Sequence, residues 1–469
     1  MSDTDLCYTS ATDLAALIRG KKLSPVELME AVLARIEAHE PAINAFATLT
    51  ADTAMEDAHK AEADVADGVA LGPLHGIPVT IKDLVVTEGI ATERGSFSQK
   101  GVVPEVDAPC VTRLKQAGSI VLGKTTTSEF GWKGVSQSPL TGITSNPWKI
   151  GYNAGASSAG AGAGAAAGFG PLHQGSDGAG SIRMPSHFSG IFGLKPTYGR
   201  VPNWPVPNND QTTHIGPMTR TVADSALMLE VMSGPHPWDH TALESAPEPY
   251  LLRLDSGVTN LRVTYSPDLG HARVDDEVAE LVTAAVNVFA NDLGCRVEEV
   301  EPTFGPDGPE IIRFLWSAHE QAFAPFLDAH KNRMDPGLIG CITSGMGHSM
   351  EDYLDMRQRK LSYVEEVHRA FEQCDLMLTP SVSVAAFPAD RLQPEHWPQH
   401  PWDWINWAEF SYPFNFSGNP AASVPCGFTK DGLPVGLQIV GRRFADLTVL
   451  QAAAAFENTY PWADKRPPL

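Results

Sequence analysis

Cysteine is sparse in this 469-residue chain, and its spacing excludes two kinds of site. The six cysteines each lie more than 30 residues from the next and form no Cys-x-x-Cys motif. That spacing argues against a zinc site and against a small disulfide framework. We therefore expect buried, reduced thiols in a cytoplasmic protein, and no metal ion.

Long apolar segments and positive charge are also scarce. No stretch approaches the roughly 18 consecutive apolar residues of a membrane-spanning helix, and the start, MSDTDLCYTSATDLAALIRGKK, has no signal-peptide core. The 34 Lys and Arg against 56 Asp and Glu give a formal charge of −22. Because an acidic surface repels phosphate, we expect neither nucleic acid nor membrane as a partner.

Several familiar catalytic motifs are missing. The chain has no Gly-x-Ser-x-Gly, no His-Glu-x-x-His, and no Gly-x-Gly-x-x-Gly in its glycine-rich stretch. The α/β-hydrolase, metalloprotease and dinucleotide-binding hypotheses therefore lose support, and we expect no cofactor. The 15 histidines show no metal-ligand spacing.

Apolar periodicity indicates an α/β fold. A β-branched segment at 76–86 precedes a helix that we expect to begin with Asp107 as its cap, and a strand at 120–122 follows. The same order recurs as a strand near 261–263, an amphipathic helix and a strand near 295–297. Alternation of this kind is typical of α/β proteins with a partly parallel sheet.

Residues 151–180 contain 10 Gly and 9 Ala, and their few polar residues are grouped rather than scattered. A flexible linker would carry exchangeable polar residues, and the alanine-rich segment 163–167 favours a helix. Downstream, the small residues at 178–180 let backbone N–H groups converge near Ser181, as an oxyanion hole requires. A tight glycine turn with a buried serine is the competing interpretation.

Several motifs together carry a family resemblance. Residues 155–160 read Gly-Ala-Ser-Ser-Ala-Gly, 178–185 read Gly-Ala-Gly-Ser-Ile-Arg-Met-Pro, and 76–83 read Gly-Ile-Pro-Val-Thr-Ile-Lys-Asp. In type and order they resemble the amidase signature family of hydrolases, and the resemblance spans nearly the whole chain. Further matching blocks lie at 193–200, 216–224, 419–421 and 432–438.

The resemblance implies a role for each matching residue. Ser181 corresponds to the nucleophile, Lys82 to the base, and Ser157, 24 residues before Ser181, to a bridging serine that follows a cis peptide bond. The family's oxyanion hole falls at the backbone N–H groups of Gly178, Ala179, Gly180 and Ser181. Side chains that brace the site fall at Ser158, Ser176, Asp177 and Arg183.

This chemistry requires an uncharged lysine. The pKa of Lys82 must fall from about 10.4 toward roughly 7–8, which burial among the apolar residues of 77–86 can achieve. A serine between lysine and nucleophile then lets one proton move in each direction during acyl transfer.

The resemblance also implies the architecture: one large α/β/α sandwich with a central mixed, mostly parallel, twisted sheet covered by helices. We expect a single domain over 1–469, with N-terminal helices in 1–60, the catalytic core in 61–240, and the remaining sheet, pocket loops and closing helix in 241–469. Alanine replaces the family's glycine at 156, 159 and 179. Wherever φ had to be positive, each alanine would cost on the order of 1 kcal/mol.

The substrate is less constrained. The Trp-rich segment 396–407, with Phe410, Tyr412 and Phe414, predicts a pocket wall or lid that accepts aromatic or apolar groups, although a surface loop anchored by aromatics fits equally. We expect an amidase that acts with water on a small or medium amide, such as an anilide or aliphatic amide, with esters and carbamates as further candidates. A homodimer is a candidate assembly by analogy.

Two alternative functions stay open. The first is the glutaminase subunit of a Glu-tRNA(Gln) amidotransferase, which shares the triad. The second is a non-catalytic binding protein on the same fold.

Overall fold

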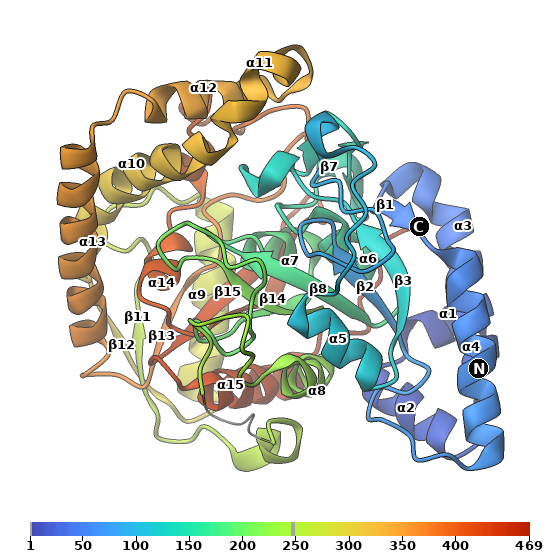
Figure 1. The fold of residues 1–469 in the computed structure, drawn as a ribbon. Coiled ribbons are helices and arrows are strands. Elements are labelled where there is room, and N and C mark those ends of the chain that lie inside the picture. The colour runs from blue at the N-terminus through green and yellow to red at the C-terminus, as the bar shows by residue number, and fades with distance from the viewer. Residues whose placement is uncertain (1, 245–248) are drawn as a thin grey trace.

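The computed structural model describes residues 2–244 and 249–469. Its N-terminal helices pack along one side of the molecule, beside the first strands of the sheet (Figure 1). Ser24 begins the longest of them, because its hydroxyl accepts a hydrogen bond from the Val26 N–H. These helices are α1 (Asp3–Tyr8), α2 (Ala11–Arg19), α3 (Pro25–Ile43) and α4 (Ala51–Asp67).

An 11-stranded sheet runs through the described residues in the order β1-β3-β2-β8-β10-β9-β14-β15-β13-β11-β12. Short hairpins β4–β5 and β6–β7 lie outside it. The strands are β1 (Phe46–Leu49), β2 (Pro78–Lys82), β3 (Ile120–Thr125), β4 (Gln137–Ser138), β5 (Gly142–Ile143), β6 (Ser145–Asn146), β7 (Lys149–Asn153), β8 (Leu172–Asp177), β9 (Phe192–Lys195), β10 (His214–Thr219), β11 (Arg262–Tyr265), β12 (Arg296–Glu299), β13 (Leu376–Pro380), β14 (Ala421–Phe428) and β15 (Pro434–Gly441).

The sheet is mixed, as expected, but the expectation that it is mostly parallel is wrong. Within the 11-stranded sheet of the described residues, six pairings are antiparallel and four are parallel. Parallel neighbours β2 and β3 are joined through α5 (Pro109–Gln116), and β11 and β12 through α9 (Asp276–Asn291). By contrast, β14 and β15 are joined by a short turn, which brings consecutive strands together only in antiparallel pairing.

The expectation that Asp107 caps α5 is also wrong. Ala108 holds the cap position and makes no side-chain capping bond. The Asp107 carboxylate instead accepts a hydrogen bond from the Glu88 N–H at 2.8 Å and pairs with Lys115 at 2.8 Å. An aspartate caps a helix only when its carboxylate is not bound elsewhere. Here the Glu88 N–H and the Lys115 ammonium group bind the carboxylate instead.

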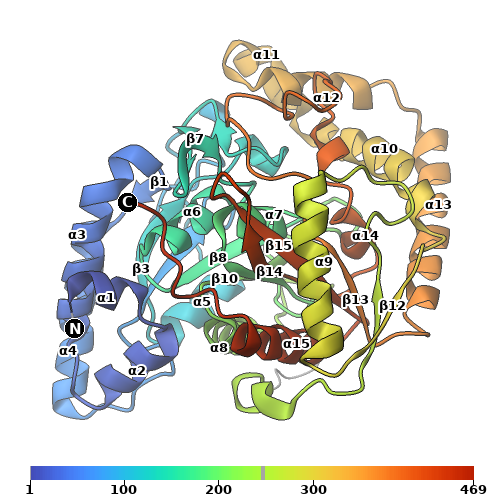
Figure 2. The same cartoon turned by 180° about the vertical axis from the view of Figure 1, so that it is seen from behind.

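Helices surround the sheet. The expected helix in the Ala-rich segment is confirmed as α6 (Ala159–Ala167), which packs on α7 (Arg183–Ser189). Figure 2 shows α9 crossing the near face of the sheet beside the closing helix α15 (Asp446–Thr459). The remaining helices are α8 (Val222–Met232), α10 (Gly308–Glu320), α11 (Leu327–His330), α12 (Pro336–Gly345), α13 (Met350–Ala370) and α14 (Tyr412–Phe416). The outer helices, α10 to α13, pack together at one edge of the molecule (Figure 1).

Short 3-10 helices fill several of the connections. No helix of the described residues is long and apolar enough to cross a membrane. The 3-10 segments are η1 (Phe97–Gln99), η2 (Glu129–Gly131), η3 (Leu251–Ser256), η4 (Gly305–Asp307), η5 (Gln321–Phe326), η6 (Lys331–Arg333) and η7 (Trp404–Trp407).

Candidate active site

The site begins where two parallel strands end side by side. Strand β2 ends at Lys82, and Ile81 lies opposite Gln174 of β8, so Lys82 reaches the level of Ser176. Its Nζ donates hydrogen bonds to Ser157 Oγ at 2.8 Å and to Ser176 Oγ at 3.0 Å. The carboxyl ends of parallel strands commonly present functional groups in this way.

Burial sets the protonation state of Lys82. The side chain is fully buried, and the desolvation of its ammonium lowers the pKa to about 7, although the negative charge of Asp177 opposes that shift. The pKa falls in the range that the sequence analysis required. Near neutral pH a large fraction of this amine is therefore unprotonated and able to accept a proton.

Ser157 and Ser158 lie in the connection between β7 and α6. The Ala156–Ser157 peptide bond is cis. The hydroxyl of Ser158 donates to the Ser176 carbonyl at 3.1 Å and accepts from the Ser176 N–H at 3.2 Å, while its own N–H donates to the Ser181 carbonyl at 3.2 Å. Ser158 therefore ties β8 to the segment that carries Ser181, as a bracing residue should.

Ser181 lies between Gly180 and the first turn of α7 and is 4% exposed. Ser157 and Ser181 line the same cavity, but among the described residues no hydrogen bond joins their hydroxyls. The structure thus forms the link from lysine to bridging serine and places the third side chain beside it. Hydrogen bonds of catalytic groups are often long in a substrate-free enzyme.

The four expected oxyanion-hole donors divide into two groups. The Gly180 N–H donates to Asp177 Oδ1 at 2.7 Å, so the expectation that Gly180 contributes a free donor is wrong. The N–H groups of Gly178, Ala179 and Ser181 make no hydrogen bond within the described part of the chain. The structure therefore leaves three of the four donors for a ligand.

A buried ion pair holds this turn in place. Asp177 accepts from Arg183 Nη2 at 2.9 Å and from the Ile182 N–H at 3.1 Å, and neither charged side chain is exposed. Burial alone would raise the pKa of Asp177, but the charge and hydrogen bonds of Arg183 outweigh it and hold that pKa well below its usual range. Arg183 also donates to Gln438 Oε1 and to the Ser411 carbonyl, which anchors the turn to β15 and α14.

The alanines at the family's glycine positions impose no left-handed strain. Ala156, Ala159 and Ala179 are absent from the residues with positive φ, so a β-carbon fits at each. Gly180 is different, because its φ is +112° and an added β-carbon would lie 2.6 Å from Ser411 Oγ. Glycine is required there by both backbone and space.

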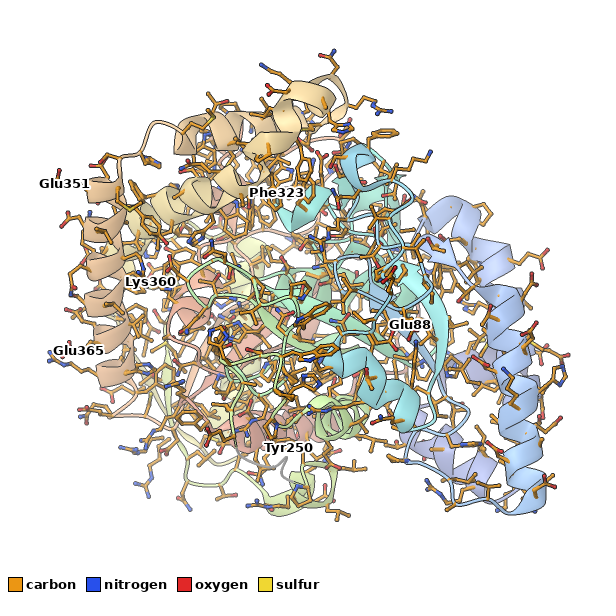
Figure 3. All side chains as sticks on the ribbon, viewed as in Figure 1. Glu88, Tyr250, Phe323, Glu351, Lys360 and Glu365 are labelled. Carbon is orange, nitrogen blue, oxygen red and sulfur yellow. The ribbon has the colours of Figure 1, made fainter. Side chains whose placement is uncertain are left out.

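A cavity of about 380 Å³ opens in front of these groups. Ser157, Ser176, Gly178 and Ser181 line its inner end. Its apolar wall comes from five chain segments far apart in sequence, and its titratable lining residues are Arg94, His319 and Glu320. Phe323 of η5, which Figure 3 labels, is one of the lining residues. The main apolar side chains are Leu84, Phe130, Trp204, Ile215, Trp316 and Phe323.

The expectation that 396–407 forms the pocket wall is wrong. Trp404 and Trp407 are buried in a second hydrophobic core, and neither lines the cavity; Phe410, Tyr412 and Phe414 belong to the same core. The Trp404 indole donates to the Trp132 carbonyl at 2.7 Å. These aromatics support the cavity from behind, and the sequence carries no local sign of which aromatics face inward.

The remaining polar features hold no metal site. No group of three or more His, Cys, Asp or Glu side chains suited to a metal ion occurs within 2–244 and 249–469. All six cysteines are free and buried, as expected.

An eleven-stranded α/β fold with a buried lysine–serine pair at the end of an apolar cavity defines a hydrolase that acts on the C–N bonds of amides rather than on peptide bonds. The chain belongs to the amidase family: residues 27–450 match the family described as Amidase. The family and the α/β fold class that the sequence predicted are therefore confirmed.

Three relatives illustrate the match. The chain is 38% identical to an acylamidase of Rhodococcus erythropolis, covering 100% of this chain and 98% of that protein. It is 34% identical to a Glutamyl-tRNA(Gln) amidotransferase subunit of Moorella thermoacetica, covering 99% of each. A bacterial aryl acylamidase of the amidase signature family superposes with a TM-score of 0.90 at 29% identity, covering 97% of each chain.

Proposed function

We propose that the protein hydrolyses the C–N bond of a small or medium organic amide through an acyl-enzyme on Ser181. The observation that carries the proposal is the 2.8 Å hydrogen bond between Lys82 Nζ and Ser157 Oγ at the end of the cavity that Ser181 also lines. A lysine of lowered pKa beside a serine supplies the base that a serine nucleophile lacks when no histidine is present.

The acylation step assigns one task to each group. Ser181 Oγ attacks the amide carbon and gives its proton to Ser157 Oγ, whose own proton passes to neutral Lys82. The N–H groups of Gly178, Ala179 and Ser181 donate to the carbonyl oxygen as it becomes negative. The relay then runs in reverse: Lys82 returns the proton through Ser157 to the departing amine nitrogen as the C–N bond breaks.

Deacylation repeats the cycle with water. Water adds to the ester carbon, its proton moves through the same relay, and the Ser181 oxygen leaves with a proton while the acid is released. The cavity wall of aromatic and aliphatic side chains limits competing solvent and favours substrates with an apolar portion. We propose anilides and aliphatic amides as the main substrates, with esters and carbamates as further ones.

The test is a panel of anilides, aliphatic amides, esters and carbamates assayed with the wild-type enzyme and with Ser181→Ala. We expect turnover of at least one amide by the wild type and none by the variant, with labelling by a fluorophosphonate probe lost in parallel. Undiminished turnover by Ser181→Ala would overturn the assignment. Failure of the wild type to be labelled would favour the non-catalytic alternative.

The similarity to the Glutamyl-tRNA(Gln) amidotransferase subunit supports a second candidate function, that of a glutaminase. In that case glutamine would be the substrate, and both of its charged α-groups would have to be bound in the cavity, whose titratable lining residues are Arg94, His319 and Glu320. A glutaminase assay with and without the partner proteins of such an enzyme separates the two. We expect no glutamine turnover in either condition.

A further inference from the structure

One face of helix α10 and the following η5 turn forms a wall of the cavity. Trp316, His319, Glu320 and Phe323 all line it. Trp316 and Glu320 lie four residues apart on one face of α10, and Phe323 follows in η5, so Glu320 lies along the chain between two aromatic residues that line the same cavity.

The carboxyl group of Glu320 has no partner in the protein. The residue is 7% exposed, its Oε2 is buried without a hydrogen bond, and no described residue donates to either oxygen. The neighbouring His319 is already engaged, because its Nε2 lies 2.9 Å from Asp210 Oδ2. Buried carboxyl groups normally have a hydrogen-bond or ionic partner. An unpaired carboxyl group in a cavity therefore indicates that a ligand supplies the partner.

No charged group of the described elements packed against α10 pairs with Glu320. On α12 the titratable side chain is Cys341, whose pKa is raised further by the charge of Glu320. On α13, Arg357 Nε and Lys360 Nζ bond to Asp210 instead. Burial with no compensating cation raises the pKa of Glu320 to about 8, so near neutral pH most of it is protonated.

Two other cations, Arg359 and Arg94, make no described bond to Glu320. Arg359 of α13 pairs with Glu310 at 2.7 Å on the outer side of α10. Arg94 lies across the cavity. Burial lowers the pKa of Arg94, and the nearby carboxylate of Asp83 partly opposes that shift. A cation entering the cavity therefore finds one carboxyl without a protein partner.

We propose that Glu320 is a specificity residue that binds a protonated amino group of the substrate, so that the enzyme acts on amides that also carry a basic amine apart from the scissile bond. The proposal rests on the amide hydrolysis proposed above and names its substrate class. Trp316 and Phe323 offer ring faces to the same ammonium group. The formal charge of −22 also favours the approach of cations over anions.

Binding of the ammonium group changes the protonation state of Glu320. The Glu320 carboxylic acid loses its proton to solvent as it pairs with the ammonium group, so a carboxylate–ammonium hydrogen bond forms and one proton is released. A charge-assisted bond is stronger than any bond that the neutral acid would make to an amide or hydroxyl donor. This difference is why we assign the subsite to an amine.

The first test compares two para-nitroanilides of equal size, the ω-aminopentanoyl and the hexanoyl compound, with wild type, Glu320→Gln and Glu320→Asp. We expect kcat/KM of the wild type to favour the amino compound. In Glu320→Gln we expect that preference, measured as the ratio of the two kcat/KM values, to fall by about 10- to 100-fold, the loss of one hydrogen bond to a charge; Glu320→Asp should retain part of the preference. A wild type without the preference, or an unchanged ratio in Glu320→Gln, would overturn the proposal.

The second test does not depend on catalysis. Calorimetry of pentylamine and of pentanol binding at pH 7, in two buffers of different ionisation enthalpy, measures proton release directly. We expect amine binding with proton release in the wild type and loss of both in Glu320→Gln. Amine binding without Glu320 dependence overturns the subsite, even if anilides are hydrolysed. Glu320-dependent binding with no hydrolysis of either anilide supports the subsite and counts against the proposed function.

Discussion

Lys82 Nζ and Ser157 Oγ are joined by a 2.8 Å hydrogen bond although 75 residues separate them in the chain. The end of strand β2 supplies the lysine, and the connection before α6 supplies the serine. The same nitrogen contacts the Ser176 hydroxyl, so the lysine is held by two serines in a site closed to solvent. An amine in this setting is able to accept a proton near neutral pH, unlike a lysine at the surface.

The lowered pKa of Lys82 predicts the pH profile. The amine works as a base only when unprotonated, and its pKa is about 7, so kcat/KM should rise with pH through about 7 and level off above it. We expect this limb to disappear in Lys82→Ala, whose residual rate should be restored most at high pH by hydroxide. Steady-state assays from acid to alkaline pH with a neutral anilide measure both. An identical limb in Lys82→Ala would exclude this lysine as the base.

Two adjacent serines should differ in their effect on catalysis. Ser157→Ala removes the hydroxyl bonded to Lys82 and should lower kcat by about 10²- to 10⁴-fold, the usual contribution of a positioned proton-transfer group. Ser158→Ala removes the brace between β8 and the Ser181 segment and should mainly cost stability, about 1 kcal/mol. Kinetics and urea unfolding of both variants measure the contrast. Equal kinetic losses would show that Ser157 acts only through structure.

Gly131 should not tolerate an added β-carbon, for a reason that can be separated from backbone strain. Its φ is +82°, and a β-carbon would lie 2.9 Å from Leu84 Cδ1 and 3.1 Å from Ser157 Oγ. Gly131→Ala should therefore displace Ser157 and lower kcat at least tenfold, a loss of roughly 1.4 kcal/mol in transition-state stabilisation.

Gly151→Ala is the matched control for that substitution. Gly151 has φ of +83° but no atom within 4 Å of the added β-carbon, so it carries the same backbone cost without the contact. We expect similar thermal stability for the two variants and nearly normal activity for Gly151→Ala. Similar activity in both would rule out crowding of Ser157.

Removal of Arg183 should destabilise the whole fold. Arg183→Met leaves the Asp177 carboxylate buried and unpaired, which typically costs about 3–5 kcal/mol of unfolding free energy. The control is Arg369→Ala, which breaks an exposed pair with Glu365 and should change stability by no more than about 0.5 kcal/mol. Denaturant titration of both measures the difference. A loss of activity with unchanged stability would mean that Arg183 acts on substrate rather than on the turn.

Much of the site could be predicted because its chemistry is encoded in short segments. The small residues around Ser181 and the apolar strand that ends at Lys82 carry their own conformational signal. Three predictions failed where several partners compete. Asp107 binds the Glu88 N–H and Lys115 and does not cap α5. The Gly180 N–H is taken by the Asp177 carboxylate, and the central strands pair antiparallel through hairpins and long returns.

The sequence by itself determined the family, the α/β class, and the positions of the lysine and serines, because these depend on local motifs and on their order along the chain. Which side chains line the cavity depends on long-range packing. Trp204, Trp316 and Glu320 reach one cavity from distant segments, while Trp404 and Trp407 turn into the core. Local periodicity shows that a side chain is apolar or that a helix has a face, but the partner of that face is fixed by long-range packing.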